Sequence, residues 1–128
     1  MKKIIVFSSL LIFVSQHVLA RQTPPKDSII VTKLWDKASH NAFPDLFKFK
    51  SYFYIAFREG AHHVSNINDG KVRIMRSKDL KKWETVTLLQ LQDIDVREAR
   101  LSATPGGKIL VTVAGGVWKD NQYLSLEP

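Results

Sequence analysis

Apolar and polar residues alternate along most of the chain after residue 45. From Leu46 to Phe57, aromatic and β-branched residues recur at every second position on both sides of a turn at Lys50 and Ser51. Alternation of period two with this composition predicts a β-hairpin. The segments 71–77 and 83–91 alternate in the same way and predict two more strands, whereas no helical period of useful length follows Ala20.

The same pattern starts again near residue 98, in "EARLSATPGGKILVTVAGG". Aligning Leu46 with Leu101 brings Ile55 close to Val111, which gives an internal offset of about 55 residues. A repeat of four strands is typical of a β-propeller blade. We therefore expect an all-β fold over residues 41–128: a partial β-propeller of about two four-stranded antiparallel blades from a five- or six-bladed fold. Residues 38–44 are expected to form a loop, and the segment 21–40 an extended lead-in that contains a possible first or closing strand.

The segment 1–20 has the pattern of a secretory signal. Lys2 and Lys3 precede an apolar run from Ile4 to Val14, and Val18 and Ala20 are the small residues that precede a signal-peptidase cut. The apolar run is shorter than the roughly 20 residues that cross a bilayer, so an uncleaved anchor is the weaker alternative. We expect cleavage after Ala20, a secreted or periplasmic protein, and no stable membrane span afterwards.

Charge and composition narrow the classes of partner. The formal charge of +7 falls to +5 when Lys2 and Lys3 leave with the signal. The charge is dispersed, because cations such as Lys48, Lys50, Lys71, Arg73 and Arg76 alternate with apolar residues as on the solvent side of strands. A nucleic-acid site would need a clustered basic stripe with aromatic stacking partners, so we expect no nucleic-acid partner. The chain has no cysteine, so disulfides and thiolate chemistry are excluded. His62 and His63 lack metal-ligand spacing, and we expect neither a metal nor another cofactor.

The stretch "RIMRSKDLKKWETV" joins the third and fourth predicted strands. A carboxylate such as Asp79 accepts backbone N–H bonds within a turn, the Ser77 hydroxyl can close the same turn, and the Trp83 ring can pack beneath it. We interpret these three residues as a structural corner and do not place them in the site.

Three motifs in order resemble the opening of a secreted sialidase-superfamily propeller, over about residues 40 to 115. "SKDLKKW" resembles the Asp-box of sialidases and BNR-repeat proteins, although it is one residue shorter and lacks the Gly, and it also resembles the Ser-x-Asp-Leu-x-x-Trp turns of five-bladed glycosidases. The other two motifs are "FPDLFKFKSYFYIAFREGAHH" and "DVREARLSATPGGKILV". The resemblance implies a protein that acts on a glycan or glycoside at the central axis.

Charged residues at the expected strand starts are candidates for that site. Asp45 is expected to open the innermost strand of the first unit, and Arg97 with Glu98 that of the second. Most glycosidases use two carboxylates that flank the glycosidic bond. The resemblance to five-bladed glycosidases matches Asp45 with a catalytic Asp, and Arg97-Glu98-Ala99 loosely with an Arg-Asp-Pro motif.

The resemblance to sialidases adds further candidates. The Arg-Ile-Pro motif of that family falls at Ala42-Phe43-Pro44, which lacks the arginine, and Arg58 is the expected substitute because a guanidinium pairs well with a carboxylate. Asp69 lies where an acid/base Asp is expected, although it also fits an ordinary turn. The candidate catalytic residues are Asp45, Glu98 and Asp69, and the candidate substrate-binding residues are Arg58, Glu59, Arg97 and His62.

Simpler interpretations stay open for several of these residues. Arg58 and Glu59 can pair with each other or with neighbours, the loop histidines can be solvated, and Trp35 and Trp118 can pack rather than stack on a sugar.

Three functional hypotheses also stay open. They are an exported glycoside hydrolase, a non-catalytic glycan- or protein-binding propeller, and a truncated chain without function. Propellers close with 4–8 blades, and the chain that follows Ala20 has room for two. We therefore expect the amino-terminal part of a longer protein, inactive on its own.

Overall fold

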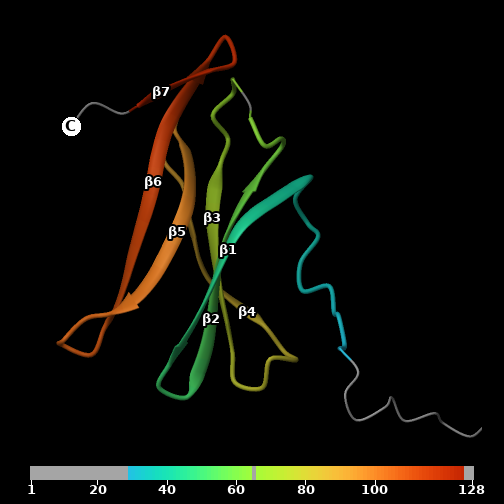
Figure 1. Cartoon of the computed structure of the whole chain (residues 1–128), viewed down its shortest axis with the longest axis vertical. Helices are drawn as coiled ribbons and strands as arrows, with labels where there is room; N and C mark the ends of the chain where they lie inside the picture. Colours follow the sequence, from blue (N-terminus) through green and yellow to red (C-terminus); the bar gives the residue numbers. More distant parts are fainter. Residues whose placement is uncertain (1–28, 65, 126–128) are drawn as a thin grey trace, which may run out of the picture. The chain divides into compact units, whose positions relative to one another are not determined.

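The computed structural model describes residues 29–64 and 66–125, so the expected signal peptide and residues 21–28 lie outside the described part. The described residues form seven strands in two antiparallel sheets that do not close into a barrel (Figure 1). The predicted fold, all-β and like part of a propeller, is confirmed. In the same residues, no helix has the length and apolar character needed to cross a membrane.

The first sheet has the order β1-β2-β3-β4, and the second the order β5-β6-β7. The second sheet thus has three strands among the described residues, one fewer than the expected blade. Strand β5 packs against β1, β2 and β3, which joins the two sheets. The strands are β1 (His40–Phe49), β2 (Tyr52–Gly60), β3 (Lys71–Ser77), β4 (Glu84–Leu89), β5 (Asp95–Ala103), β6 (Ile109–Lys119) and β7 (Gln122–Ser125).

The register of the two leading hairpins matches the repeat in the sequence. Leu46 pairs with Ile55 between β1 and β2, and Leu101 pairs with Val111 between β5 and β6. These are the four residues that the sequence alignment brought together. The internal offset therefore connects equivalent places in two equivalent hairpins.

Both leading strands also contain a β-bulge at the same point of the repeat. Between Ala42 and Asp45, two residues of β1 stand opposite one residue of β2, and between Arg97 and Arg100 two residues of β5 stand opposite one residue of β6. The first bulged residue is Phe43 in β1, with φ of 54°, and Glu98 in β5, with φ of 52°. The structural counterpart of Glu98 is thus Phe43, not Asp45.

One expectation at the start of the fold is wrong. Strand β1 begins at His40, where a loop was expected, so Asp45 lies within the strand instead of opening it. Pro44 is tolerated because the bulge removes it from the hydrogen-bonded ladder, where its missing N–H would matter. Residues 29–36 lie in no strand, so the first or closing strand considered for this segment stays a prediction.

The core lies where β5 crosses the first sheet. Small side chains from both sides, Ala56 on β2 and Ala99 on β5, are fully buried and let the backbones approach closely. Buried polar residues lie in the same strands and include Arg58, Glu59, Asp95 and Arg97. Burying a charge is costly unless the charge is paired, so these buried charged residues mark the candidate functional site. The other buried members of the core are Val72, Ile74, Val96 and Leu101.

The turn between β3 and β4 has the predicted construction. Asp79 Oδ1 accepts the backbone N–H groups of Lys81 and Lys82, both at 2.9 Å, and the Ser77 hydroxyl at 3.1 Å. The Trp83 indole N–H donates to the Leu80 carbonyl at 3.2 Å. The bonds from Lys82 and Lys81 stabilise the charged carboxylate and lower the pKa of Asp79 to about 2. The predicted bonds of Ser77 and Asp79 within the turn are confirmed, and the Trp83 indole is tied to the same turn.

Candidate functional site

A buried ion pair joins the two sheets. Arg58 Nε on β2 donates to Asp95 Oδ1, on the first residue of β5, at 2.7 Å, and both side chains are at most 1% exposed. Next to this pair, the Val96 N–H donates to the Gly70 carbonyl at 3.0 Å. A Cβ atom on Gly70 would overlap the Asp95 carboxylate. The pair therefore depends on a glycine before β3 and fixes the start of β5 against β2.

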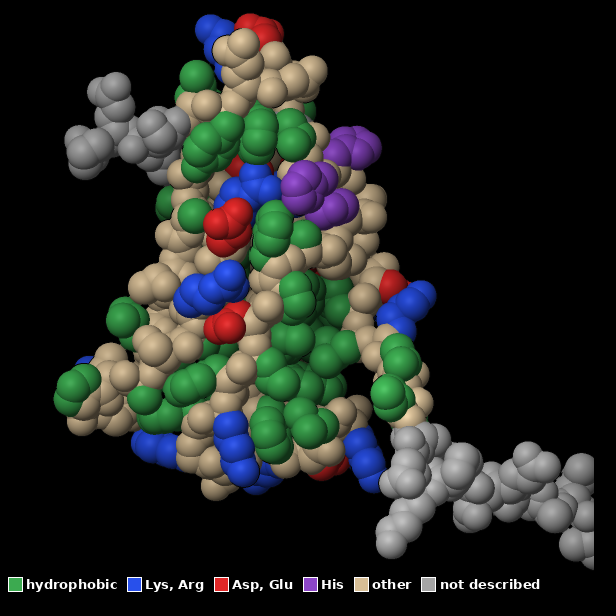
Figure 2. Space-filling view, viewed as in Figure 1, with side chains coloured by type: hydrophobic (Ala, Val, Ile, Leu, Met, Phe, Trp, Pro, Cys, Tyr) green, Lys and Arg blue, Asp and Glu red, His purple; other side chains and the backbone are tan. Residues whose placement is uncertain are grey.

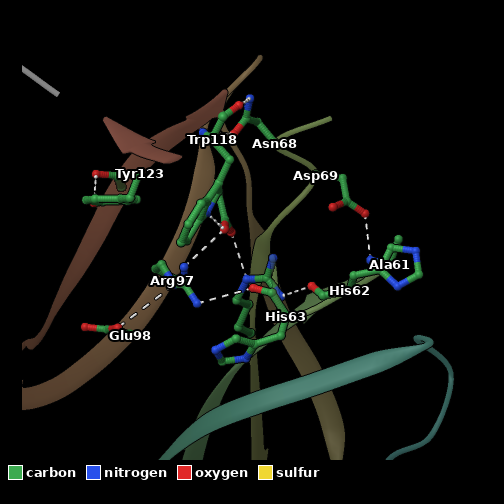
Figure 3. A network of polar contacts seen from close by, with 12 residues as sticks. Ala61, His62, His63, Asn68, Asp69, Arg97, Glu98, Trp118 and Tyr123 are labelled. Carbon is green, nitrogen blue, oxygen red and sulfur yellow. Dashed lines mark hydrogen bonds and ion pairs between the residues drawn. The ribbon is translucent and has the colours of Figure 1, made fainter. Parts of the chain in front are cut away.

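Asp95 is shared by a second arginine and an indole. Trp118 Nε1 donates to Asp95 Oδ2 at 2.9 Å, and Arg97 Nη1 lies 3.5 Å from the same oxygen. Each guanidinium also reaches the loop after β2: Arg58 Nη1 donates to the His62 carbonyl at 3.0 Å and Arg97 Nη2 to that of His63 at 3.5 Å. Figure 3 shows this network, which we call the Arg58–Asp95–Arg97 cluster.

Within the cluster two guanidinium groups share the Asp95 carboxylate, and the exposed Glu98 adds a longer contact, from its Oε1 to Arg97 Nε at 3.9 Å. Arg58 Nη2 and Arg97 Nε are buried without a hydrogen-bond partner among the described residues. Buried donors are normally paired, so unsatisfied ones mark strain or a ligand position. Since Arg58 is fully buried, Arg97 is the member of the cluster that a ligand can contact.

A cleft of about 440 Å³ opens beside Arg97. The Arg97 guanidinium carbon lies 5.0 Å from the ring centre of Phe43 and 5.6 Å from that of Trp118. Glu98, whose side chain is 51% exposed, lines the same cleft, and its Oε1 atom lies 3.9 Å from Arg97 Nε (Figure 3). One guanidinium, one accessible carboxylate and several aromatic faces are a combination that suits a polyhydroxylated ligand. The full lining is Phe43, His63, Arg97, Glu98, Ala114, Trp118 and Tyr123.

The three candidate carboxylates lie in three different settings. Asp45 Oδ2 accepts the Leu101 N–H at 2.7 Å, so this side chain braces β1 against β5. Asp69 Oδ2 accepts the Ala61 N–H at 2.7 Å, while its Oδ1 is buried without a partner in the described part of the chain. Glu98 lines the cleft. Of the three, Glu98 is the one placed beside Arg97.

Of the four candidate substrate-binding residues, two lie in the cluster and two have side chains outside it. Arg58 and Arg97 are brought together through Asp95, as described above. Glu59 faces away from them and holds Arg73 by two bonds, Nε to Oε1 at 2.5 Å and Nη2 to Oε2 at 3.0 Å. This is the pairing with a neighbour that the sequence left open. The His62 side chain is exposed, and its contribution to the cluster is its backbone carbonyl.

Two other histidines border the site. The rings of His40 and His63 meet edge to face with centroids 5.2 Å apart, and the His63 ring is 5.5 Å from that of Phe43. His40 Nδ1 is buried without a partner in the described residues. Burial lowers the pKa of His40 below its usual value of 6.5, and the positive charges of Arg58, His63, Arg97 and His62 lower it further. Protonation of His40 is therefore disfavoured in the folded protein.

Sequence reasoning missed Asp95 as a site residue and treated Trp118 only as a packing or stacking residue. Successive side chains of a strand point to opposite faces, so Asp95 and Arg97 necessarily share a face. That spacing was the available signal. The contact of Asp95 with Arg58 could not be read in the same way, because it joins residues 37 apart on two different sheets.

Comparison of the chain with known family models, curated proteins and solved structures finds no match. Among residues 29–64 and 66–125, no group of three or more histidine, aspartate or glutamate side chains is arranged to hold a metal ion. The fold and the site define the class: an all-β protein, like part of a propeller, with a cationic cluster under an aromatic cleft.

Proposed function

We propose that this chain is an exported, glycoside hydrolase-like protein of the sialidase-superfamily kind, and that the cleft at Arg97, Glu98 and Trp118 binds its glycan. The observation that carries the proposal is the Arg97 guanidinium close to two aromatic rings, at 5.0 and 5.6 Å from their centres, with an exposed carboxylate in the same cleft. The order of the three sialidase-like motifs along the chain supports the same class.

Each group has a role that follows from its chemistry. Arg97 donates hydrogen bonds to sugar hydroxyl or carboxylate oxygens, and its packing between Phe43 and Trp118 reduces the entropy lost on binding. The aromatic rings contact the apolar face of a sugar. Glu98 is the candidate general acid or base. Arg58 is too deeply buried to touch a ligand and instead positions Asp95, which orients Arg97.

Binding without hydrolysis is the second candidate function. Hydrolysis by two carboxylates needs a partner for Glu98 at about 5–10 Å across the bond. Asp45 and Asp69 each use one oxygen to hold a backbone N–H group, which favours a structural role for both. The cleft then supplies one carboxylate, enough to bind a glycan but not enough for this mechanism.

Calorimetric titration of the full chain with sialylated and with neutral oligosaccharides tests the proposal. We expect saturable binding that Arg97→Gln weakens at least tenfold. Arg100→Gln is the matched control, because Arg100 is exposed on the same strand and carries the same charge. Absence of binding by the unchanged protein, or an equal loss in both variants, would overturn the assignment.

Release of a fluorophore from labelled glycosides separates the two functions. A glycoside hydrolase releases it, and Glu98→Gln abolishes the release while glycan binding is retained. Binding with no release identifies the non-catalytic function instead.

A further inference from the structure

A second surface, around the turn between β3 and β4 at one end of the first sheet, combines aromatic rings with an excess of lysine. Two neighbouring clefts share Trp83. The larger, of about 490 Å³, lies between the segment 32–37 and the β3–β4 turn, and the smaller, of about 320 Å³, lies between that turn and Tyr52. We call the two clefts together the Trp83 surface. It shares no lining residue with the cleft at Arg97.

The charges of the Trp83 surface are unbalanced. Six cations line it, against the two acids Asp79 and Glu84. Asp79 is engaged by the backbone of its own turn, Glu84 pairs with Arg76 at 2.6 Å, and Lys33 pairs with Asp36 at 3.5 Å. The excess of positive charge therefore comes from the four other lysines of the surface. Figure 2 shows Lys and Arg side chains along the lower edge, where Figure 1 places the turns between β1 and β2 and between β3 and β4. The six cations are Lys33, Lys37, Arg76, Lys78, Lys81 and Lys82.

The aromatic rings of this surface have two different roles. The Trp35 ring is covered by Arg73, at 4.3 Å from its centre, and by Lys37, at 5.0 Å, so it holds cations in place. Tyr52 does the same for Arg76 and Lys78, at 4.8 and 5.2 Å. Trp83 borders both clefts, and its indole N–H is fixed to the Leu80 carbonyl. An immobilised ring between two lysine-lined hollows suits a ligand that has both a flat apolar face and repeated negative charges.

We propose that the Trp83 surface binds an acidic polysaccharide, one whose sugar rings carry sulfate or carboxylate groups. A sugar ring stacks on Trp83, while anionic groups on the neighbouring sugars contact Lys37 and Lys81 on one side and Lys78 and Lys82 on the other. The charge excess gives the attraction, and the shared ring selects a sugar chain over a plain polyanion. This site goes beyond the proposed function and does not depend on it, since it holds a polymer away from the cleft at Arg97.

Calorimetric titration of the full chain with dextran sulfate, neutral dextran and polyphosphate tests the proposal. We expect dextran sulfate to bind more tightly than polyphosphate of equal charge, and neutral dextran not to bind. The affinity for dextran sulfate should fall as the salt concentration rises, because salt screens exposed charges. Absence of dextran sulfate binding, or equal affinity for polyphosphate, would overturn the proposal. Tighter binding of an oligodeoxythymidylate or of phosphatidylglycerol vesicles would overturn it in favour of a nucleic acid or a membrane.

Variants locate the site. The triple variant Lys78→Gln, Lys81→Gln, Lys82→Gln is expected to weaken dextran sulfate binding at least tenfold. The matched control is the triple variant Arg100→Gln, Lys108→Gln, Lys119→Gln, which removes three exposed cations from the second sheet and its turn. It is expected to change the affinity for dextran sulfate less than twofold. Equal losses in the two triple variants would mean that net charge alone drives binding, contrary to the proposal.

Trp83→Leu tests the stacking. It is expected to remove the preference for dextran sulfate over polyphosphate while leaving polyphosphate affinity unchanged, with circular dichroism confirming that the fold is kept. Because the indole also fixes the turn, Trp83→Phe is measured beside it, and this variant is expected to retain the preference. A preference that survives Trp83→Leu would contradict the role given to the ring.

Discussion

Phe43 and Glu98 occupy the same position in their respective sheets. Each is the first residue of a bulge in the leading strand, each has a left-handed backbone, with φ of 54° and 52°, and each lines the cleft at Arg97. A left-handed conformation costs a residue other than glycine about 1–2 kcal/mol. Bulges redirect side chains next to functional sites, so the repeated bulge explains how two non-glycine residues reach one cleft.

This strain gives a way to separate stability from function at Glu98. Glu98→Gly relieves the left-handed backbone, so the free energy of unfolding in urea should stay the same or rise by about 1 kcal/mol, while glycan binding or turnover falls. Glu98→Gln keeps the strain and should leave stability unchanged. If Glu98→Gly instead lowers the free energy of unfolding by more than about 1 kcal/mol, the Glu98 side chain stabilises the fold and the prediction is wrong.

The Asp95 carboxylate should be essential to the fold, because it is shared by two buried guanidinium groups. Asp95→Asn keeps the shape and removes the charge. Breaking a buried ion pair by removing one partner costs about 3–5 kcal/mol, and urea unfolding should show a loss of that size. Asp93→Asn is the matched control: Asp93 is exposed two residues earlier and should change stability by less than about 0.5 kcal/mol. Similar small effects of both variants on stability would mean that Asp95 does not pair with Arg58 and Arg97 in the folded protein.

The glycine before β3 should tolerate no side chain. In Gly70→Ala the new Cβ atom meets the Asp95 carboxylate and lies 2.9 Å from Arg58 Nε, so the ion pair must move. Overpacking of a closed site costs about 1–3 kcal/mol, again measured by urea unfolding. Gly106→Ala, whose Cβ atom would have one neighbour at 4.0 Å, should be close to neutral. A neutral Gly70→Ala would contradict the close approach of Gly70 and Asp95.

Most of the strands could be predicted from the alternation of residue types, because successive side chains of a strand point to opposite faces of the sheet. The start of β1 could not, since Pro44 and its neighbours have the composition of a loop and only the bulge makes a proline acceptable there. The corner at Asp79 was predictable because all its bonds are local. The cluster was not: Arg58 and Arg97 attract notice as charges, but Asp95 becomes their partner only when β5 packs against β2.

His40 should make the protein less stable in mild acid. Burial first, and then the nearby positive charges of Arg58, His63, Arg97 and His62, lower the pKa of His40 in the folded state below its usual 6.5. The unfolded state therefore binds the proton more readily. Stability is fully present above pH of about 6.5 and falls as the pH drops through that value, before carboxylates begin to titrate.

Urea unfolding midpoints at several pH values from about 7.5 to 5 measure this effect. The midpoint should fall with pH in the unchanged protein, and His40→Gln should flatten the dependence. His62→Gln removes an exposed imidazole and should leave most of the slope. The His40 resonance, followed by NMR, should titrate below 6.5. A His40 that titrates at or above its usual value, or a slope that survives His40→Gln, would show that the ring is solvated and that the cationic cluster does not act on it.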